Sequence, residues 1–201
     1  MKHQNNLNYA QNLDQQDELR KYREQFFIPK VNNKESVYLC GNSLGLQPKS
    51  TESFLKQELE DWKNLGVEGH FHGKNPWFHY HKFLNEKEAK IVGAKTDEVV
   101  LMNSLTTNLH LLMVSFYRPT KQKYKIITEG GAFPSDQYAL ETQIKFHGFN
   151  TEEALIELFP RNGETTLRTE DILKAIEEHK DSLALVMMAG VQYYTGQFFE
   201  I

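Results

Sequence analysis

Polar side chains that could bind a phosphate lie in residues 102–109. A strand is predicted to end here and a helix to begin. In an open α/β sheet, ligands bind at the carboxyl ends of the strands, and the free N–H groups of a helix N-terminus favour a phosphate. The hydroxyls of Thr106 and Thr107 add hydrogen-bond donors. Ordinary N-capping by Thr or Asn is the competing interpretation, and the Gly-x-x-x-x-Gly-Lys pattern of a P-loop is missing.

A second candidate segment, residues 130–136, also follows a predicted strand and opens a predicted helix. Phe133 would lie at the carboxyl edge of the sheet, where a flat aromatic ring could stack on a flat cofactor. Asp136 falls in the first turn of the helix, where a carboxylate could simply complement the helix dipole. For Phe133 the competing interpretation is an ordinary core aromatic.

The loop at residues 41–48 holds Ser43 between two glycines, and a simple turn would account for that composition as well. A histidine cluster follows, with a repeated His-x-His spacing that would place pairs of rings on one face of a strand: His70, His72, His79 and His81. Such pairs could bind zinc or nickel. Because no cysteine is nearby and acidic partners are sparse, we expect no metal. Cys40 is expected to be a small buried hydrophobe.

The elements that must position these residues follow from the apolar pattern. Short apolar runs predict strands at residues 37–40, 99–102, 124–127 and 183–188. Helical spacing predicts helices at residues 14–27, 51–65, 83–91, 107–117 and 135–146, and one capped by Thr169. The unbroken apolar run at 183–188 is typical of a strand buried on both faces of a parallel sheet. Alternating strands and helices predict an α/β fold with right-handed crossovers.

Composition excludes several classes of protein. The chain has 201 residues, a formal net charge of −4 and one cysteine. The acidic balance argues against a nucleic-acid surface, and one cysteine forms no internal disulfide. No apolar run approaches the roughly 20 residues of a membrane span, and the N-terminus lacks the apolar stretch of a signal peptide. We therefore expect a cytoplasmic protein with no nucleic-acid or membrane partner.

Taken in order, these segments resemble the signature motifs of the kynureninases. The matching stretches are YLCGNSLGLQP (38–48), GHFHGKNPW (69–77), LMNSLTTNLHLL (101–112), AFPSD (132–136) and YTGQ (194–197). The resemblance covers nearly all of the chain after about residue 35. Several motifs in the right order make it specific.

The resemblance implies a fold-type-I architecture that binds pyridoxal 5'-phosphate (PLP), with a mostly parallel sheet and flanking helices. Residues 1–66 would contribute to the small domain and an active-site loop, and residues 67–201 would form an incomplete PLP-binding large domain. Family members are homodimers. They hydrolyse kynurenine, or 3-hydroxykynurenine, to anthranilate or its hydroxy form and alanine, in tryptophan catabolism and NAD biosynthesis.

The resemblance also assigns roles to single residues. Leu105 and Thr106 would hold the PLP phosphate, in agreement with the helix N-terminus predicted there. Phe133 would stack on the pyridine ring, and Asp136 would belong to the hydrogen-bond network around the cofactor.

Ser43 and His70 would meet the aromatic end of the substrate. The family's Schiff-base lysine and the aspartate that pairs with the pyridine nitrogen lie in its C-terminal half, and no matching segment occurs before Ile201. We therefore expect a chain that stops before the end of the large domain, carries no catalytic residue of its own and is inactive alone.

Three alternatives stay open at this point. A cysteine desulfurase-like PLP lyase would typically stack histidine on the cofactor, whereas this chain has Phe133. A non-catalytic fragment could associate with a partner or with itself. A metal-binding protein would use the histidine cluster.

Overall fold

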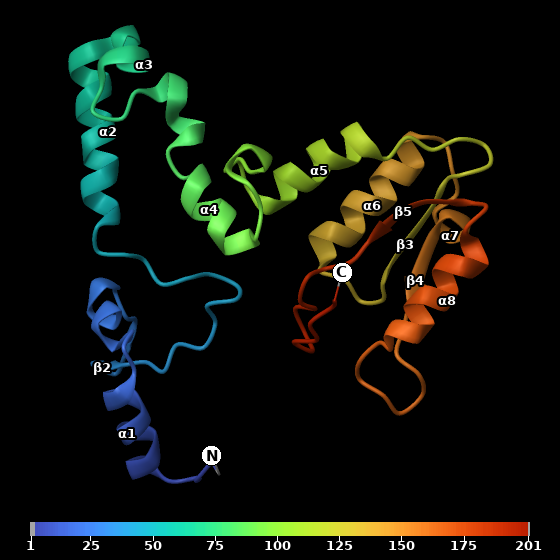
Figure 1. Ribbon diagram of the computed structural model, residues 1–201, viewed down its shortest axis with the longest axis horizontal. Helices are drawn as coiled ribbons and strands as arrows, with labels where there is room; N and C mark the ends of the chain where they lie inside the picture. The colour runs from blue at the N-terminus through green and yellow to red at the C-terminus, as the bar shows by residue number, and fades with distance from the viewer. Residues whose placement is uncertain (1–2, 201) are drawn as a thin grey trace. The chain divides into compact units, whose positions relative to one another are not determined.

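A computed structural model describes residues 3–200 of the chain (Figure 1). It divides into two compact units between Val100 and Leu101. The division expected between residues 66 and 67 stays a prediction, and residues 1, 2 and 201 of the expected domains lie outside the described residues.

Helical elements dominate the first unit. Its α-helices are α1 (Leu7–Gln16), α2 (Thr51–Leu65), α3 (Gly69–His72) and α4 (Asn85–Val92). Its 3-10 helices are η1 (Arg20–Gln25), η2 (Gly66–Glu68), η3 (Trp77–Lys82) and η4 (Thr96–Glu98). The unit also contains two antiparallel strands of two residues each, β1 (Lys30–Val31) and β2 (Lys34–Glu35). Helix α2 confirms the prediction for residues 51–65, and it ends where Gly66 adopts a positive φ of 54°.

Three predictions for residues 14–40 are wrong. The helix expected at residues 14–27 is broken because the Asp17 carboxylate accepts a hydrogen bond from the Leu19 N–H at 2.8 Å, which ends α1 near Gln16. Residues 37–40 form no strand. The Cys40 carbonyl instead accepts turn hydrogen bonds from the Ser43 and Leu44 N–H groups. Cys40 is exposed rather than buried.

The second unit is a mixed α/β structure around a three-stranded parallel sheet. Its elements are α5 (Leu105–Phe116), β3 (Lys125–Glu129), α6 (Pro134–Phe146), α7 (Thr151–Ala154), β4 (Leu155–Leu158), α8 (Thr169–His179) and β5 (Leu183–Met187). The strand order is β4-β3-β5, so β3, which comes first in the chain among these three strands, is central (Figure 1). The predicted helices at 107–117, 135–146 and after Thr169 are confirmed, as are the strands near 124–127 and 183–188.

The core of the second unit forms where helices α5 and α6 cover one face of this sheet. Ile126 of β3 is fully buried in a cluster with Met113 and Tyr117 from the α5 segment and with Leu140 and Ile144 from α6. Ile127, the next residue of β3, is also fully buried, and successive side chains of a strand point to opposite faces. Helix α8 packs against β3. The crossovers β3–α6–β4 and β4–α8–β5 run in opposite directions across the sheet. Because such crossovers are almost always right-handed, α6 and α8 are expected on opposite faces.

Three further corrections concern strands. Residues 99–102 are extended at Val99 but pair with no strand among residues 3–200, so they are not a strand. Strand β4 was not predicted. The segment 183–188 is not buried on both faces: β5 lies at an edge of the sheet, and its side chains alternate between half-buried and exposed.

Candidate functional site

The N-terminus of α5 is shaped by a local hydrogen-bond network. Ser104 is the N-cap, and its Oγ accepts from the Thr107 N–H at 3.4 Å. Asn103 has a positive φ of 50°. Its side-chain amide donates to Asn108 Oδ1 at 3.1 Å, while Asn108 Nδ2 donates to the Met102 carbonyl at 2.7 Å. Asn108 therefore ties the turn at residues 102–104 to the first turns of the helix.

Thr106 occupies the second position of α5 and is partly buried. The cap is Ser104, with the Thr107 hydroxyl 3.1 Å from its Oγ. Within residues 3–200 the Thr106 hydroxyl forms no hydrogen bond. N-capping therefore does not account for the presence of Thr106.

A pocket of about 340 Å³ opens at the carboxyl ends of β3 and β5. Helices α5 and α6 contribute the other walls. The lining residues are Leu105, Asn108, Leu109, Leu112, Glu129, Asp136, Met187, Met188 and Ala189. Two of the residues predicted to bind the cofactor, Leu105 and Asp136, thus face one cavity. Thr106 and Phe133 are not among its lining residues.

Glu129 is a buried carboxylate at the carboxyl end of β3, with 4% of its surface exposed. Its Oε2 accepts a hydrogen bond from the Ala189 N–H at 3.2 Å, which joins the ends of β3 and β5 at the pocket. Glu129 is not among the site residues predicted from the sequence. The signal that could have found it is an acidic residue at the end of an apolar strand, directly before Gly130 and Gly131.

Phe133 precedes α6, whose first residue is Pro134. The Phe133 ring is 50% exposed, so the interpretation as an ordinary core aromatic is wrong. It meets the ring of Tyr193 edge to face, with centroids 5.1 Å apart. Asp136 lies in the first turn of α6, where its Oδ1 accepts from the Ser135 hydroxyl at 3.2 Å. An exposed flat ring and a half-buried carboxylate therefore lie three residues apart at this edge of the sheet.

The two predicted substrate residues belong to the first unit. His70 lies on α3, and its ring packs edge to face against Trp77 at a centroid distance of 5.4 Å. Glu58 fixes this region, because its carboxylate accepts from Trp77 Nε1 and from Asn75 Nδ2, both at 2.8 Å. Ser43 is exposed in a turn, and its hydroxyl forms no hydrogen bond within residues 3–200.

The histidine cluster does not have the expected geometry. His70 and His72 lie on the short helix α3, and His79 and His81 lie on η3, so the expectation of rings along a strand is wrong. Among the described residues, no group of three or more His, Cys, Asp or Glu side chains is placed to hold a metal ion. The metal-binding alternative therefore finds no support in the geometry.

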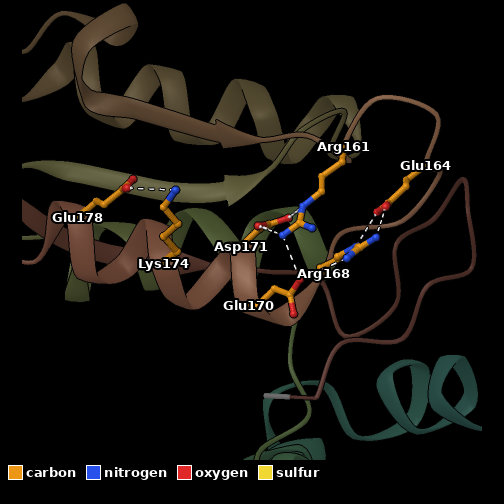
Figure 2. A network of polar contacts seen from close by, with 7 residues as sticks. All are labelled: Arg161, Glu164, Arg168, Glu170, Asp171, Lys174 and Glu178. Atoms are coloured by element: carbon orange, nitrogen blue, oxygen red, sulfur yellow. Dashed lines mark hydrogen bonds and ion pairs between the residues drawn. The ribbon is translucent and has the colours of Figure 1, made fainter.

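An ion-pair network connects the loop before α8 to the start of that helix (Figure 2). Arg161 donates to both oxygens of Asp171, at 2.8 and 2.7 Å, and to Glu170 at 2.9 Å. Arg168 pairs with Glu164 and Glu170. The hydrogen bond from Arg161 holds the pKa of Asp171 below its usual range. The network lies at the surface, with its side chains 29–64% exposed.

Comparisons with known proteins address the family. No family model matches the chain. A curated kynureninase from Myxococcus xanthus is 58% identical over 194 residues, which are 96% of this chain and 46% of that protein. Curated kynureninases from Christiangramia forsetii and Homo sapiens are 51% and 47% identical, over 100% and 96% of this chain. This chain belongs to the kynureninase family.

The chain spans about half the length of the curated kynureninases that it matches. The matches favour kynureninase over a cysteine desulfurase-like lyase. They do not test individual residues, so the roles of Leu105, Thr106, Phe133 and Asp136 in binding the cofactor, and those of Ser43 and His70, stay predictions. No helix in residues 3–200 is both long and apolar enough to cross a membrane.

Proposed function

We propose that the protein containing this chain is a PLP-dependent kynureninase, which hydrolyses kynurenine or 3-hydroxykynurenine to anthranilate or its hydroxy form and alanine. The observation that carries the proposal is the pocket at the carboxyl ends of β3 and β5, lined by Leu105 and Asp136. That position is where open α/β sheets bind ligands. The identity of 46–58% to curated kynureninases supports the choice of reaction.

The N-terminus of α5 suits the phosphate of PLP. A helix N-terminus presents free N–H groups and the positive end of the helix dipole. Leu105 and Thr106 are the first two residues of α5. The Thr106 hydroxyl, which has no partner within residues 3–200, would donate a further hydrogen bond. Glu129 of β3 and Asp136 of α6 line the same pocket as Leu105.

Phe133 and Asp136 suit the ring of the cofactor. PLP would supply an electron sink for the substrate carbon to which it is joined. The Phe133 ring is half-exposed and could stack on the pyridine ring without first being uncovered. Asp136 offers a carboxylate that is partly withdrawn from solvent and can accept hydrogen bonds from the polar groups around the cofactor.

Ser43 and His70 would contact the aromatic end of the substrate. The His70 ring is exposed and held at one edge by Trp77, so it could offer either a ring face or a nitrogen to the substrate. We also infer a fold-type-I architecture, a homodimer and a cytoplasmic location. The parallel sheet supports the first of these, and the single cysteine and acidic charge support the last.

Two experiments test the proposal. In the first, the purified chain is dialysed against PLP, and retained PLP is measured. We expect saturable binding of one equivalent that competes with inorganic phosphate. In the second, the chain is joined to the part of the Myxococcus xanthus kynureninase that it does not match, and anthranilate release from kynurenine is followed by fluorescence. Sulfide release from cysteine without anthranilate would point to the desulfurase-like alternative.

A further inference from the structure

Gln192 is a buried side chain whose amide forms four hydrogen bonds, and 8% of its surface is exposed. Its Oε1 accepts from the Tyr194 N–H at 2.6 Å, the Thr195 N–H at 2.8 Å and the Thr195 hydroxyl at 3.3 Å. Its Nε2 donates to the Gly131 carbonyl at 3.2 Å. Both ends of the amide are thus used, as a buried amide requires.

These bonds join two segments that are far apart in the sequence. The acceptor side organises the turn at residues 192–197, in which the Gln192 backbone also donates to the Gln197 carbonyl at 2.8 Å. The donor side reaches Gly131, which has a positive φ of 66° and lies two residues before Phe133. Gln192 is the side chain through which the turn at 192–197 is bonded to the segment that carries Phe133.

The residue after Gln192 lies against Phe133. Tyr193 follows Gln192 directly, and its ring meets the Phe133 ring edge to face at 5.1 Å and 81°. Both rings are about half exposed, Phe133 at 50% and Tyr193 at 47%, so solvent surrounds much of each. A half-exposed ring with few neighbours has rotamer freedom that must be lost when a ligand stacks on it.

We propose that Gln192 is a positioning residue that holds Tyr193 against Phe133 and so orients the Phe133 ring before PLP binds. The inference rests on the proposed function, in which Phe133 stacks on the cofactor. Gln192 touches neither PLP nor substrate in this proposal. It acts by bonding the turn at 192–197 to Gly131, which reduces the orientational freedom that Phe133 loses on binding.

Gln197 provides a matched control. It is a glutamine of the same turn, and its side-chain amide also forms two bonds that cross to another segment. Its Oε1 accepts from the Leu167 N–H at 2.8 Å, and its Nε2 donates to the Leu167 carbonyl at 2.7 Å. Gln197→Ala therefore removes two side-chain hydrogen bonds of the turn without touching the bond to Gly131.

The first measurement needs no ligand. 4-Fluorophenylalanine is placed at position 133 of the chain, and its ¹⁹F resonance is recorded for wild type and for Gln192→Ala, Gln192→Glu, Gln197→Ala and Tyr193→Ala. Gln192→Ala should move the resonance toward the position seen in Tyr193→Ala. Gln192→Glu keeps an acceptor but loses the donor to Gly131, so it should give the same direction of change. Gln197→Ala should leave the resonance in place.

The second measurement is PLP affinity, with the induced circular dichroism of bound PLP as a readout of ring orientation. Gln192→Ala should weaken binding by about 2- to 10-fold, the range expected when one side chain must be ordered on binding. In the Tyr193→Ala background the same substitution should add little, because the contact through which it acts is already gone.

The outcomes separate the two proposals. If the chain binds no PLP and its fusion to the unmatched part of the Myxococcus xanthus kynureninase releases no anthranilate, the proposed function fails, while the ¹⁹F measurement still decides the role of Gln192. A Phe133 resonance unchanged in both Gln192 variants overturns the positioning role. It is overturned equally if Gln197→Ala shifts the resonance as far as Gln192→Ala does, because the effect would then be a general loosening of the turn.

Discussion

The rings of Phe133 and Tyr193 meet edge to face, with centroids 5.1 Å apart. The two residues come from segments that follow different strands, β3 and β5. Pairing of those parallel strands brings the segments together at one edge of the sheet. The aromatic surface of the candidate site is thus a product of strand pairing, and it does not exist in either segment alone.

Replacing Phe133 by leucine should weaken PLP binding. Leucine keeps much of the apolar volume but loses the flat ring, so the expected cost is about 0.5–1.5 kcal/mol, the range for aromatic pairs beyond simple burial. Equilibrium dialysis of the chain against PLP measures it. Phe146→Leu is the matched control, since Phe146 is an exposed phenylalanine at the other end of α6. Equal affinities in wild type and Phe133→Leu would remove the stacking role.

Thr106→Ala should also weaken PLP binding, because a hydrogen bond to a charged phosphate would be lost. The expected cost is about 1.5–3 kcal/mol. Thr142→Ala removes the same hydroxyl from α6, where it donates to its own helix at Tyr138 and Ala139, and should leave PLP affinity unchanged. A Thr106→Ala chain that melts at a lower temperature yet binds PLP normally would indicate a purely structural threonine.

Because of Tyr117, the free energy of unfolding should depend on pH in the alkaline range. It is 1% exposed, its hydroxyl donates to the Tyr124 carbonyl at 2.6 Å, and burial raises its pKa to about 12. The unfolded chain ionises near pH 10, so this contribution to stability is complete below about pH 10 and is lost as the pH rises toward 12. The free energy of unfolding falls by at most about 1.4 kcal/mol per pH unit.

Urea unfolding of wild type and Tyr117→Phe at neutral and at alkaline pH tests this dependence. Near pH 7 the variant should be less stable by about 0.5–1.5 kcal/mol, because one hydrogen bond is missing. Between about pH 10 and 12 the difference in free energy of unfolding between wild type and variant should become smaller, because phenylalanine has no proton to lose. If the free energies of unfolding of the two proteins differ by a constant amount across that pH range, Tyr117 does not ionise with an altered pKa.

Gly69→Ala should disturb the surroundings of His70. A Cβ at Gly69 would lie 2.7 Å from the Trp77 ring, so the indole, which donates to Glu58, would have to shift. Overpacking of this kind costs about 1–3 kcal/mol. The measurement is tryptophan emission together with thermal unfolding. Gly45→Ala, which meets nothing within 4 Å, is the control and should change neither. An unshifted emission in Gly69→Ala would contradict the close contact.

Elements with strong local signals were predictable from the sequence. The apolar runs of β3 and β5 and the helical spacing of α5, α6 and α8 depend mainly on neighbouring residues. Strand β4 was not predicted because Glu157 interrupts a run of only four residues. The strand expected at residues 99–102 failed for the opposite reason, because extended apolar backbone becomes a strand only where a partner is available.

The candidate site was predictable only in part. Leu105 and Asp136 carry local signals, and both line the pocket. Glu129 carries only the local signal of an acidic residue before Gly130, and Gln192 carries none, because their partners Ala189 and Gly131 lie about 60 positions away in sequence. Long-range hydrogen bonds of this kind leave no periodicity for sequence analysis to detect.

The central position of β3 has a consequence for synthesis on the ribosome. Both strands that pair with β3 come later in the chain, so its first partner, β4, is complete only at Leu158 and its second, β5, only at Met187. At translation rates of about 5–20 residues per second, the wait for the second partner is on the order of seconds. For that time Ile126 and Ile127 belong to a nascent strand without its full set of neighbours. The growing polypeptide should therefore be a client for chaperones that act at the ribosomal exit.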